Sequence, residues 1–303
     1  MTSVQQEPGE ELVCVILVNW NGWRDTLACL ESCAELAYPH LEVIVVDNGS
    51  TDDSIARLRE HFPGLRLVET DANLGFAGGN NAGMRAALPL GAAYLWLLNN
   101  DTRVDPAALT ELVDVMRSDP SVGIAASKIY HQDRPGTLSY AGGYLSPVWG
   151  WASHRGVDEL DEGRYDEVTD VDFATGCSLL ARASAVASIG PLPEHYFLYW
   201  EDIDWSARAR QAGWRVVYAP GSRVWHKHGG STPDGGRHVK WRYEGRNRLL
   251  FYRRQSRPAM ARITLSTLLN AVYLVVRGRP RAARALMLGV LDAARGRTGM
   301  VLP

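Results

Sequence analysis

Residues 95–102 read LWLLNNDT and join the pattern of a buried strand to a polar turn. Four consecutive apolar residues are typical of a strand that is covered on both faces. A carboxylate at the end of such a strand is costly to bury unless it is paired or holds a cation. Ligands of open α/β sheets lie at the carboxyl ends of their strands. Asp101 is therefore a candidate ligand for a divalent cation, and an ordinary Asn/Asp turn is the alternative.

Similar apolar runs that end in polar residues precede this stretch. Residues 12–18 (LVCVILV) run into Asn19, and residues 41–46 (LEVIVV) run into Asp47. Apolar residues at helical spacing follow both runs. Strands that alternate with helices through brief loops predict an α/β fold with a mostly parallel sheet flanked by helices. Further strands are expected at residues 65–69, 122–126 and 214–218, and at residues 171–180 with an interruption at Thr175 and Gly176.

Residues 73–83 read NLGFAGGNNAG and contain four glycines and three asparagines. Glycines allow a backbone to approach a ligand closely and to adopt positive φ. The spacing differs from G-x-G-x-x-G, and no strong strand runs directly into it, so a dinucleotide-binding fingerprint is a poor match. We expect a glycine-rich loop here, with a helix from residue 84; ligand binding and simple chain reversal are both open.

Two later stretches contain further candidate residues. Residues 196–205 read YFLYWEDIDW, in which three acids follow large apolar side chains. Such surroundings raise the pKa of a carboxylate toward values useful for a general base. The same acids are also favourable at the start of a helix. Residues 224–228 read VWHKH, where His226 is a candidate metal ligand, although a single histidine is more often structural.

The composition is that of a globular protein. The chain has 303 residues, of which 46% are hydrophobic and 22% are charged, so it can bury one large or two modest domains. Its four cysteines lack metal-binding spacing and are expected to be reduced, as in a cytoplasmic protein. Residues 1–11 are polar and acidic, which predicts a flexible N-terminus and no signal peptide. No apolar run reaches the roughly 18 residues of a spanning helix.

Charge is distributed unevenly along the chain. Before Arg237 there are 17 basic and 32 acidic residues, and from Arg237 onward there are 15 basic residues and two acids. The carboxyl-terminal part is predicted to be helical, with amphipathic pieces at residues 263–276 and 281–291. Such a segment suits an anionic surface, such as lipid headgroups or lipid-linked phosphate, rather than nucleic acid. Helices that pack on the body with a solvated basic face are the alternative.

Six of these motifs occur together in an order typical of one enzyme family. They are VVDNGSTD, NLGFAGGNNAG, LLNNDT, TGCSLL, YWEDIDW and VWHKHGGS, and they lie within residues 12–231. In this the sequence resembles the inverting family 2 glycosyltransferases, and among them the rhamnosyltransferase and galactofuranosyltransferase-like branch. The resemblance implies a GT-A fold. Residues 12–104 would be its nucleotide-sugar-binding half, residues 105–232 its acceptor-binding half, and residues 233–303 a basic helical extension.

The resemblance also implies roles for the matching residues. Asp47 would bind the pyrimidine N3–H of a UDP- or dTDP-sugar, and Asn19 would contact the same nucleoside. Asp101 would hold Mg²⁺ or Mn²⁺ together with His226. The first carboxylate of the usual D-x-D motif is replaced by an asparagine, which makes the second ligand more important. The other nucleotide-binding residues would be Asn73, Gly75, Gly79, Asn80, Asn99 and Asn100.

On the acceptor side, Asp202 matches the catalytic base, and Thr175, Gly176 and Glu201 would bind the acceptor. The implied reaction is a metal-dependent, single displacement that moves a sugar, L-rhamnose by the branch, to a hydroxyl of a glycan, a lipid-linked or a small-molecule acceptor. The enzyme would work in the cytoplasm, with peripheral contact to the inner face of the plasma membrane through its basic extension.

Three other functions fit parts of the sequence. A non-catalytic module that binds nucleotide sugars would need the same donor residues, and a membrane-surface scaffold would need only the basic extension. A nucleotidyltransferase is disfavoured because the turn after the first strand, NWNGWRD, carries only Arg24 where a basic, glycine-rich signature is required.

Overall fold

The apolar runs near the start of the chain form adjacent parallel strands. In the computed structural model, which describes residues 11–227 and 236–301, β1 lies between β2 and β4, and β3 extends the sheet beyond β2. All of these strands pair in parallel. The strands of this half are β1 (Val13–Asn19), β2 (Leu41–Asp47), β3 (Arg66–Glu69) and β4 (Tyr94–Asn99).

The other half of the sheet is mixed. The strand order is β10-β12-β6-β11-β4-β1-β2-β3, with β5 on β12 and β7 on β6. The strand β11 is antiparallel to β4 and β6, whereas β12 is parallel to β6. The strands of this half are β5 (Thr102–Val104), β6 (Val122–His131), β7 (Arg134–Tyr140), β10 (Thr169–Asp170), β11 (Ser178–Arg182) and β12 (Arg215–His226). A separate hairpin consists of β8 (Gly143–Leu145) and β9 (Ala152–His154).

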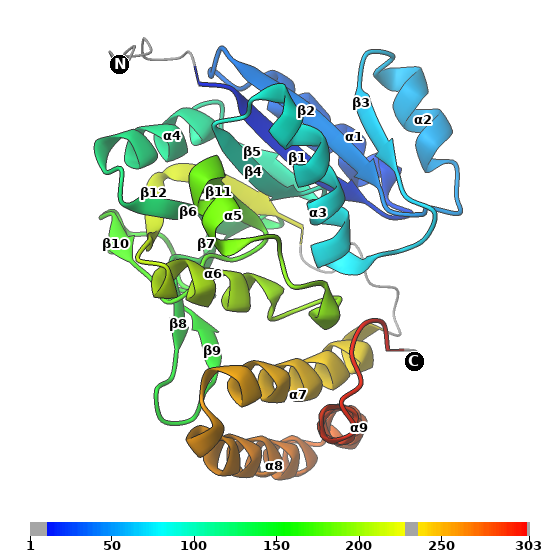
Figure 1. Ribbon diagram of the computed structural model, residues 1–303, viewed down its shortest axis with the longest axis vertical. Coiled ribbons are helices and arrows are strands. Elements are labelled where there is room, and N and C mark those ends of the chain that lie inside the picture. Colours follow the sequence, from blue (N-terminus) through cyan, green and yellow to red (C-terminus); the bar gives the residue numbers. More distant parts are fainter. Residues whose placement is uncertain (1–10, 228–235, 302–303) are drawn as a thin grey trace.

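Helices cover the sheet and form a group of their own at the carboxyl end. Figure 1 shows α7 between the α/β body and α8, with α9 beside them. The helices of the body are α1 (Trp23–Ala34), α2 (Ser54–His61), α3 (Gly75–Ala87), α4 (Ala108–Ser118), α5 (Ala183–Ile189) and α6 (Glu201–Gln211). The carboxyl-terminal helices are α7 (Gly236–Gln255), α8 (Met260–Val276) and α9 (Pro280–Ala294). Among the described residues, no helix has both the length and the apolarity needed to cross a bilayer.

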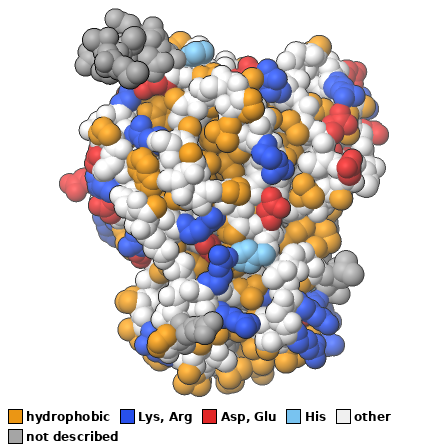
Figure 2. Space-filling view, in the orientation of Figure 1, with side chains coloured by type: hydrophobic (Ala, Val, Ile, Leu, Met, Phe, Trp, Pro, Cys, Tyr) orange, Lys and Arg blue, Asp and Glu red, His pale blue; other side chains and the backbone are white. Residues whose placement is uncertain are grey.

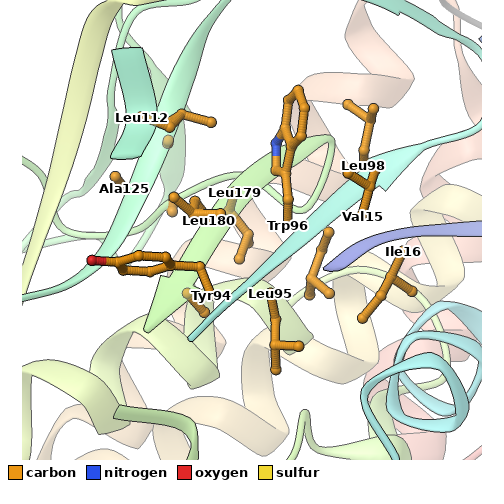
Figure 3. Packing of buried hydrophobic residues seen from close by; sticks show 14 of the residues in the cluster. Val15, Ile16, Tyr94, Leu95, Trp96, Leu98, Leu112, Ala125, Leu179 and Leu180 are labelled. Atoms are coloured by element: carbon orange, nitrogen blue, oxygen red, sulfur yellow. The ribbon is translucent and has the colours of Figure 1, made fainter. Parts of the chain in front are cut away.

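The core is centred on β4, the strand of the LWLL run. Its side chains alternate between two buried faces and meet residues of β1 and β11 (Figure 3). Trp96 is fully buried, and its indole N–H donates to Ser178 Oγ at 3.0 Å. Burial of each large apolar side chain stabilises the fold by about 1.5–3 kcal/mol. All four cysteines are buried and unpaired, as the sequence predicts.

One sequence prediction is wrong in its secondary structure. Residues 75–83 form the first part of α3 and not a loop. A Cβ atom on Gly83 would lie 2.4 Å from Ile16 Cγ2, and one on Gly79 would lie 2.7 Å from Val18 Cγ1. These glycines therefore allow α3 to pack closely on β1.

The stretch 171–180 also differs from its prediction. Only its last residues belong to a strand, because β11 begins at Ser178. Residues 171–177 form no named strand, although the N–H of Val171 donates to the carbonyl of Val216 in β12 at 2.9 Å. They turn at Thr175, whose carbonyl accepts a hydrogen bond from the backbone N–H of Ser178. Helix α6 begins at Glu201, so the three acids of YWEDIDW lie in its first turn, where acids are favourable.

The predicted helical extension is present, and it packs on the body. Leu249 and Phe251 of α7 share an apolar cluster with Phe173, Tyr196 and Trp200 of the body. The predicted flexible N-terminus, residues 1–11, lies outside the described residues except for Glu11.

Candidate active site

A chain of side-chain hydrogen bonds joins the carboxyl ends of β1, β2 and β4. Asn19 donates to Asp47 Oδ1 at 2.8 Å, and its own Oδ1 accepts from Thr26 Oγ1 at 2.9 Å. Asn100 completes the chain by donating to Thr26 Oγ1 at 2.8 Å. All four side chains are buried. The register makes this possible, because Asn19 pairs with Asp47 across the sheet.

Asp47 uses both carboxylate oxygens inside the protein. Its Oδ2 accepts from the backbone N–H of Ser50 at 3.0 Å, and Ser50 Oγ also accepts from Asn19 at 3.1 Å. The side chain of Asp47 is only 1% exposed. In this arrangement Asp47 orders the turn that follows β2, and its contact with a pyrimidine stays a prediction.

Asn48, which the sequence analysis did not single out, holds the start of α3. Its Nδ2 donates to Asn73 Oδ1 at 3.2 Å and to the carbonyl of Gly75 at 3.1 Å. Asn73 in turn accepts from the backbone N–H of Gly75 at 2.8 Å, and Gly75 has a φ of +74°. Asn73 and Gly75, which the sequence predicts as nucleotide-binding residues, thus lie beside the end of β2.

The structure places the other two residues of this motif differently. Gly79 and Asn80 are buried inside α3, and Asn80 donates to the carbonyl of Phe76 at 2.9 Å. Their observed contacts are packing contacts, so any effect on a nucleotide would act through the position of α3.

The predicted metal ligands meet although 125 positions separate them. Asp101 Oδ1 lies 3.0 Å from His226 Nε2, and Asn99 Nδ2 lies 3.3 Å from the same nitrogen. Pairing of β12 with β5 brings them together, because His226 lies opposite Thr102.

The spacing of this pair fits a divalent cation. The two side chains are hydrogen-bonded at 3.0 Å, and a carboxylate oxygen and an imidazole nitrogen placed so close could together hold a divalent cation. Within residues 11–227 and 236–301, no cluster of three or more His, Cys, Asp or Glu side chains suits a metal. Oxygens of a bound diphosphate or water would therefore have to complete the coordination of an ion on Asp101 and His226.

A cavity of about 440 Å³ lies beside these groups. It extends from the end of β4 to the start of α6. Residues predicted to bind the metal and the nucleotide and residues predicted to bind the acceptor therefore line the same cavity. The predicted residues that line it are Asn99, Thr175, Gly176, Glu201, Asp202 and His226.

Asp202 has the environment of a general base. Its Oδ2 accepts from the backbone N–H of Gly176 at 2.9 Å, and its Oδ1 accepts from the N–H of Ile203 at 2.8 Å. Part of the side chain faces the cavity, but protein encloses the rest. This burial raises the pKa of Asp202 to about 6, against the lowering effect of the two hydrogen bonds.

The neighbouring Glu201 has a different environment. It is buried, and its Oε2 has no hydrogen-bond partner among the described residues. Burial, followed by the nearby charge of Asp202, raises the pKa of Glu201 well above its usual value. Burial thus favours the neutral form of Glu201, whose side chain lines the cavity beside Asp202.

The segment before Asp202 has an unusual backbone. Phe197, Tyr199 and Trp200 have φ values of +67°, +66° and +80°. Such conformations cost about 1–3 kcal/mol each in residues other than glycine, and they persist where the surroundings hold them. Strain of this kind occurs often at active sites.

Buried polar side chains of α7 hold this strained segment. Asn247 donates to the carbonyls of Leu198 at 2.9 Å and Tyr199 at 2.8 Å, and Arg246 donates to the carbonyl of Tyr196 at 2.7 Å. Both side chains are fully buried. The position of the predicted base therefore depends on a helix from the carboxyl-terminal group.

A family model described as Glycosyl transferase family 2 matches residues 14–186, which is more than half of the chain. This protein belongs to glycosyltransferase family 2. The match contains β1 to β11, and with it the network of Asp47 and Asn100 and the predicted ligand Asp101. The identification favours an enzyme over a non-catalytic binding module or a membrane scaffold.

Two characterised relatives place this glycosyltransferase near the predicted branch. It is 28% identical over 213 residues to the N-acetylglucosaminyl-diphospho-decaprenol L-rhamnosyltransferase of Mycobacterium tuberculosis, covering 63% of this chain and 68% of the relative. It is 24% identical over 272 residues to the galactofuranosyltransferase GlfT2 of the same species, covering 80% of this chain and 41% of that one.

Solved structures confirm the GT-A fold. The mannosyltransferase PcManGT from Pyrobaculum calidifontis, solved in complex with GDP-Man and Mn²⁺, superposes with a TM-score of 0.57 at 19% identity, covering 93% of this chain and 75% of that one. GalNAc-T7 with UDP, GalNAc and Mn²⁺ gives a TM-score of 0.60 at 15% identity, covering 81% of this chain and 50% of that one.

Several residues of the glycosyltransferase site were missed in the sequence. Asn48 and Ser50 lie in the VVDNGSTD motif, where their polarity was a usable signal. Thr26 has no such signal, because only the folded chain shows that it joins two strands. Lys240 and Glu244 of α7 also line the cavity, and Glu244 accepts from the indole N–H of Trp200 at 2.8 Å.

We expect Asn247→Ala to lower the turnover of the glycosyltransferase, because the strained segment before Asp202 would relax. A misplacement of about 1 Å can cost about 10²-fold in rate, so a loss of about 10- to 10²-fold is expected. The measurement is the rate of nucleoside diphosphate release at saturating donor, with Asn270→Ala in α8 as the control. Unchanged turnover in a folded Asn247→Ala variant would show that α7 does not position the base.

Proposed function

We propose that this glycosyltransferase moves a sugar from a UDP- or dTDP-sugar to an acceptor hydroxyl and inverts the anomeric configuration. The observation that carries the proposal is that Asp202 and the residues around the Asp101–His226 pair line one cavity. A base and a site for the leaving diphosphate thus face the same space.

The donor would lie over the carboxyl ends of β1, β2 and β4, where ligands of α/β sheets bind. In this proposal Asp47 and Asn19 recognise the pyrimidine, Asn73 and Gly75 contact the ribose, and the 99–100 turn contacts the diphosphate. The hydrogen-bond network supports these roles because it fixes the polar groups before a ligand arrives. Gly79 and Asn80 would contribute through the packing of α3.

Asp101 and His226 would hold Mg²⁺ or Mn²⁺. Such an ion neutralises the charge that develops on a departing diphosphate. Two of the related solved structures contain Mn²⁺, and the spacing of the pair suits either ion.

In the proposed reaction an ionised oxygen of Asp202 accepts the proton of the acceptor hydroxyl. The hydroxyl oxygen then bonds to the anomeric carbon from the face opposite the diphosphate, which leaves with the electron pair of the broken C–O bond. One displacement inverts the configuration. Glu201 would hydrogen-bond to the acceptor, and Thr175 and Gly176 would border it. A Cβ atom on Gly176 would lie 2.7 Å from Phe76 Cζ, so only glycine leaves the N–H of residue 176 so close to Asp202.

The sugar and the acceptor are further parts of the proposal. L-rhamnose is the proposed sugar because a named L-rhamnosyltransferase is 28% identical to this chain. A lipid-linked acceptor is the proposed substrate class, since the name of that relative includes a diphospho-decaprenol.

Asp202→Asn should lower the turnover by about 10²–10⁴-fold, which is the usual contribution of a general base. Circular dichroism should confirm that the variant is folded. Product formation at saturating acceptor is the measurement, with Asp114→Asn, an exposed position on α4, as the control. Near-native turnover by Asp202→Asn would refute the role of the base.

The pH profile follows from the same group. Asp202 has a pKa of about 6 and accepts a proton only when ionised, so kcat/KM should fall about tenfold per pH unit below 6 and level off above it. The profile should be measured from pH 4.5 to 8, with circular dichroism at each pH to confirm folding. A level profile down to pH 4.5 would exclude a base with this pKa.

Removal of either metal ligand should weaken Mn²⁺ binding. Loss of an outer partner of a ligand typically costs about 10–100-fold in metal affinity, so loss of Asp101 or His226 should cost at least as much. The loss of the free Mn²⁺ signal in electron paramagnetic resonance, recorded with UDP present, measures the affinity of Asp101→Ala and His226→Ala. His61→Ala, exposed on α2, is the control. Unchanged affinity in both variants would place the metal elsewhere.

A further inference from the structure

The outer face of α8 is apolar and exposed. Its large side chains recur at helical spacing, and each is more than half exposed: Leu265, Leu269, Val272, Tyr273, Val275 and Val276. Figure 2 shows hydrophobic side chains gathered along the lower edge of the molecule, where Figure 1 places α8. Contiguous apolar patches on a soluble protein mark interaction sites more often than chance exposure.

The opposite face of α8 is already used for packing. Ile263, Thr267, Ala271 and Leu274 are buried, and Ala271 and Leu274 pack against α9. A helix that is apolar nearly all round is typical of a helix with partners on every side. Among the described residues, none covers the outer face, so this face awaits a partner from outside the described chain.

Arginines surround this apolar face. Residues 256–303 contain eight arginines, no lysine and one acid, Asp292. Asp292 is buried and already paired with Arg242 and Arg297. Exposed arginines lie at both ends of α8, at Arg262 in its first turn and in a cluster after its last residue: Arg277, Arg279, Arg281 and Arg284.

Part of this distribution opposes the helix dipoles, although Arg277 at the end of α8 is favourably placed. Cations in the first turn oppose the helix dipole, and Arg262 in α8 and Arg281 in α9 both occupy such positions. Each of these two positions destabilises its helix. An anionic partner would offset this cost and would also match the charge around the apolar face.

The α8 helix of a second copy of this chain does not provide such a partner. Because arginines lie at both ends of α8, a two-fold pairing of the two outer faces brings arginines against arginines in either direction, without an exposed carboxylate from residues 256–301 to pair them. An anionic bilayer provides both an apolar region and negative charge. Its acyl chains can cover the apolar face of α8, and its phosphates can bind the arginines.

We propose that α8 docks this enzyme on an anionic lipid bilayer, with its outer face in the headgroup and acyl boundary. The surface lies away from the donor residues and does not depend on the proposed roles of Asp101 or Asp202. It is tied to the cavity through α7, which packs against α8 and α9 and contributes Lys240 and Glu244 to the cavity wall. A docked enzyme would thus hold its acceptor cavity at a fixed position relative to the membrane.

The test is sedimentation of the full chain with vesicles. Vesicles of phosphatidylcholine with phosphatidylglycerol should pellet the protein at low salt, and vesicles of phosphatidylcholine alone should pellet it weakly. The triple variant Leu269→Gln, Val272→Gln, Val276→Gln should lower the partition coefficient by about tenfold or more, since apolar burial is lost. Arg277→Gln with Arg281→Gln should lower it about 10- to 30-fold at low salt, because each arginine contributes about 1 kcal/mol.

The matched control is Leu160→Gln with Val168→Gln, two exposed apolar residues of the body, which should leave the partition unchanged. Mn²⁺ binding in the presence of UDP should be measured on every variant. It distinguishes a variant that has lost only vesicle binding from one whose donor site is also impaired. Two results would overturn the proposal: no sedimentation of the folded wild-type chain with anionic vesicles, or sedimentation that the α8 variants do not reduce. Light scattering that shows a dimer, converted to a monomer by the triple variant, would assign the face to self-association instead.

Discussion

The buried hydrogen bonds from Asp47 through Asn19 and Thr26 to Asn100 are the constraint on which the rest of this glycosyltransferase depends. They form only if β1, β2 and β4 keep one register, because a shift by one residue would turn the polar ends away from each other. A buried carboxylate without partners is costly, so Asp47 in turn favours that register. The hydrogen-bonded groups that fix the carboxyl ends of these strands thus also form the candidate donor site.

The acceptor side depends on a different kind of constraint. Three residues with positive φ precede α6, and Asn247 and Arg246 of α7 donate to carbonyls of this segment, those of Tyr196, Leu198 and Tyr199. The strain places Trp200 in the core and Asp202 at the cavity, where burial raises the pKa of the carboxyl group. The carboxyl-terminal helices therefore support the segment that carries the predicted base, although the family model ends at residue 186.

Much of the donor half could be predicted from the sequence because its strands are continuous apolar runs with polar ends. The meeting of Asp101 and His226 was predicted from the family resemblance and not from spacing, since it requires β12 to pair with β5. The glycine-rich stretch was misjudged because glycine disfavours helix by about 1 kcal/mol, and its close packing on β1 overrides that preference. The boundaries of the two halves and the roles of the site residues stay predictions.

The role of α7 in holding the strained segment could not be predicted from the sequence, for a different reason. Asn247 acts through hydrogen bonds to carbonyls that lie 48 and 49 positions earlier, and no local pattern reports such contacts. The exposed side of α8 has the opposite character. Its apolar and basic residues were visible in the sequence, but only the packing of Ile263 and Leu274 shows which face is left outside.

The central claim is that the carboxyl ends of β1, β2 and β4, where the hydrogen-bond network lies, bind a pyrimidine nucleoside diphosphate together with a divalent ion. Calorimetric titration of UDP, dTDP, GDP and ADP, each with and without Mn²⁺, tests it most directly. We predict binding of UDP or dTDP that depends on Mn²⁺, and little binding of GDP or ADP. Equal binding of a purine diphosphate, or pyrimidine binding that ignores Mn²⁺, would contradict the assignment of Asp47 and of the Asp101–His226 pair.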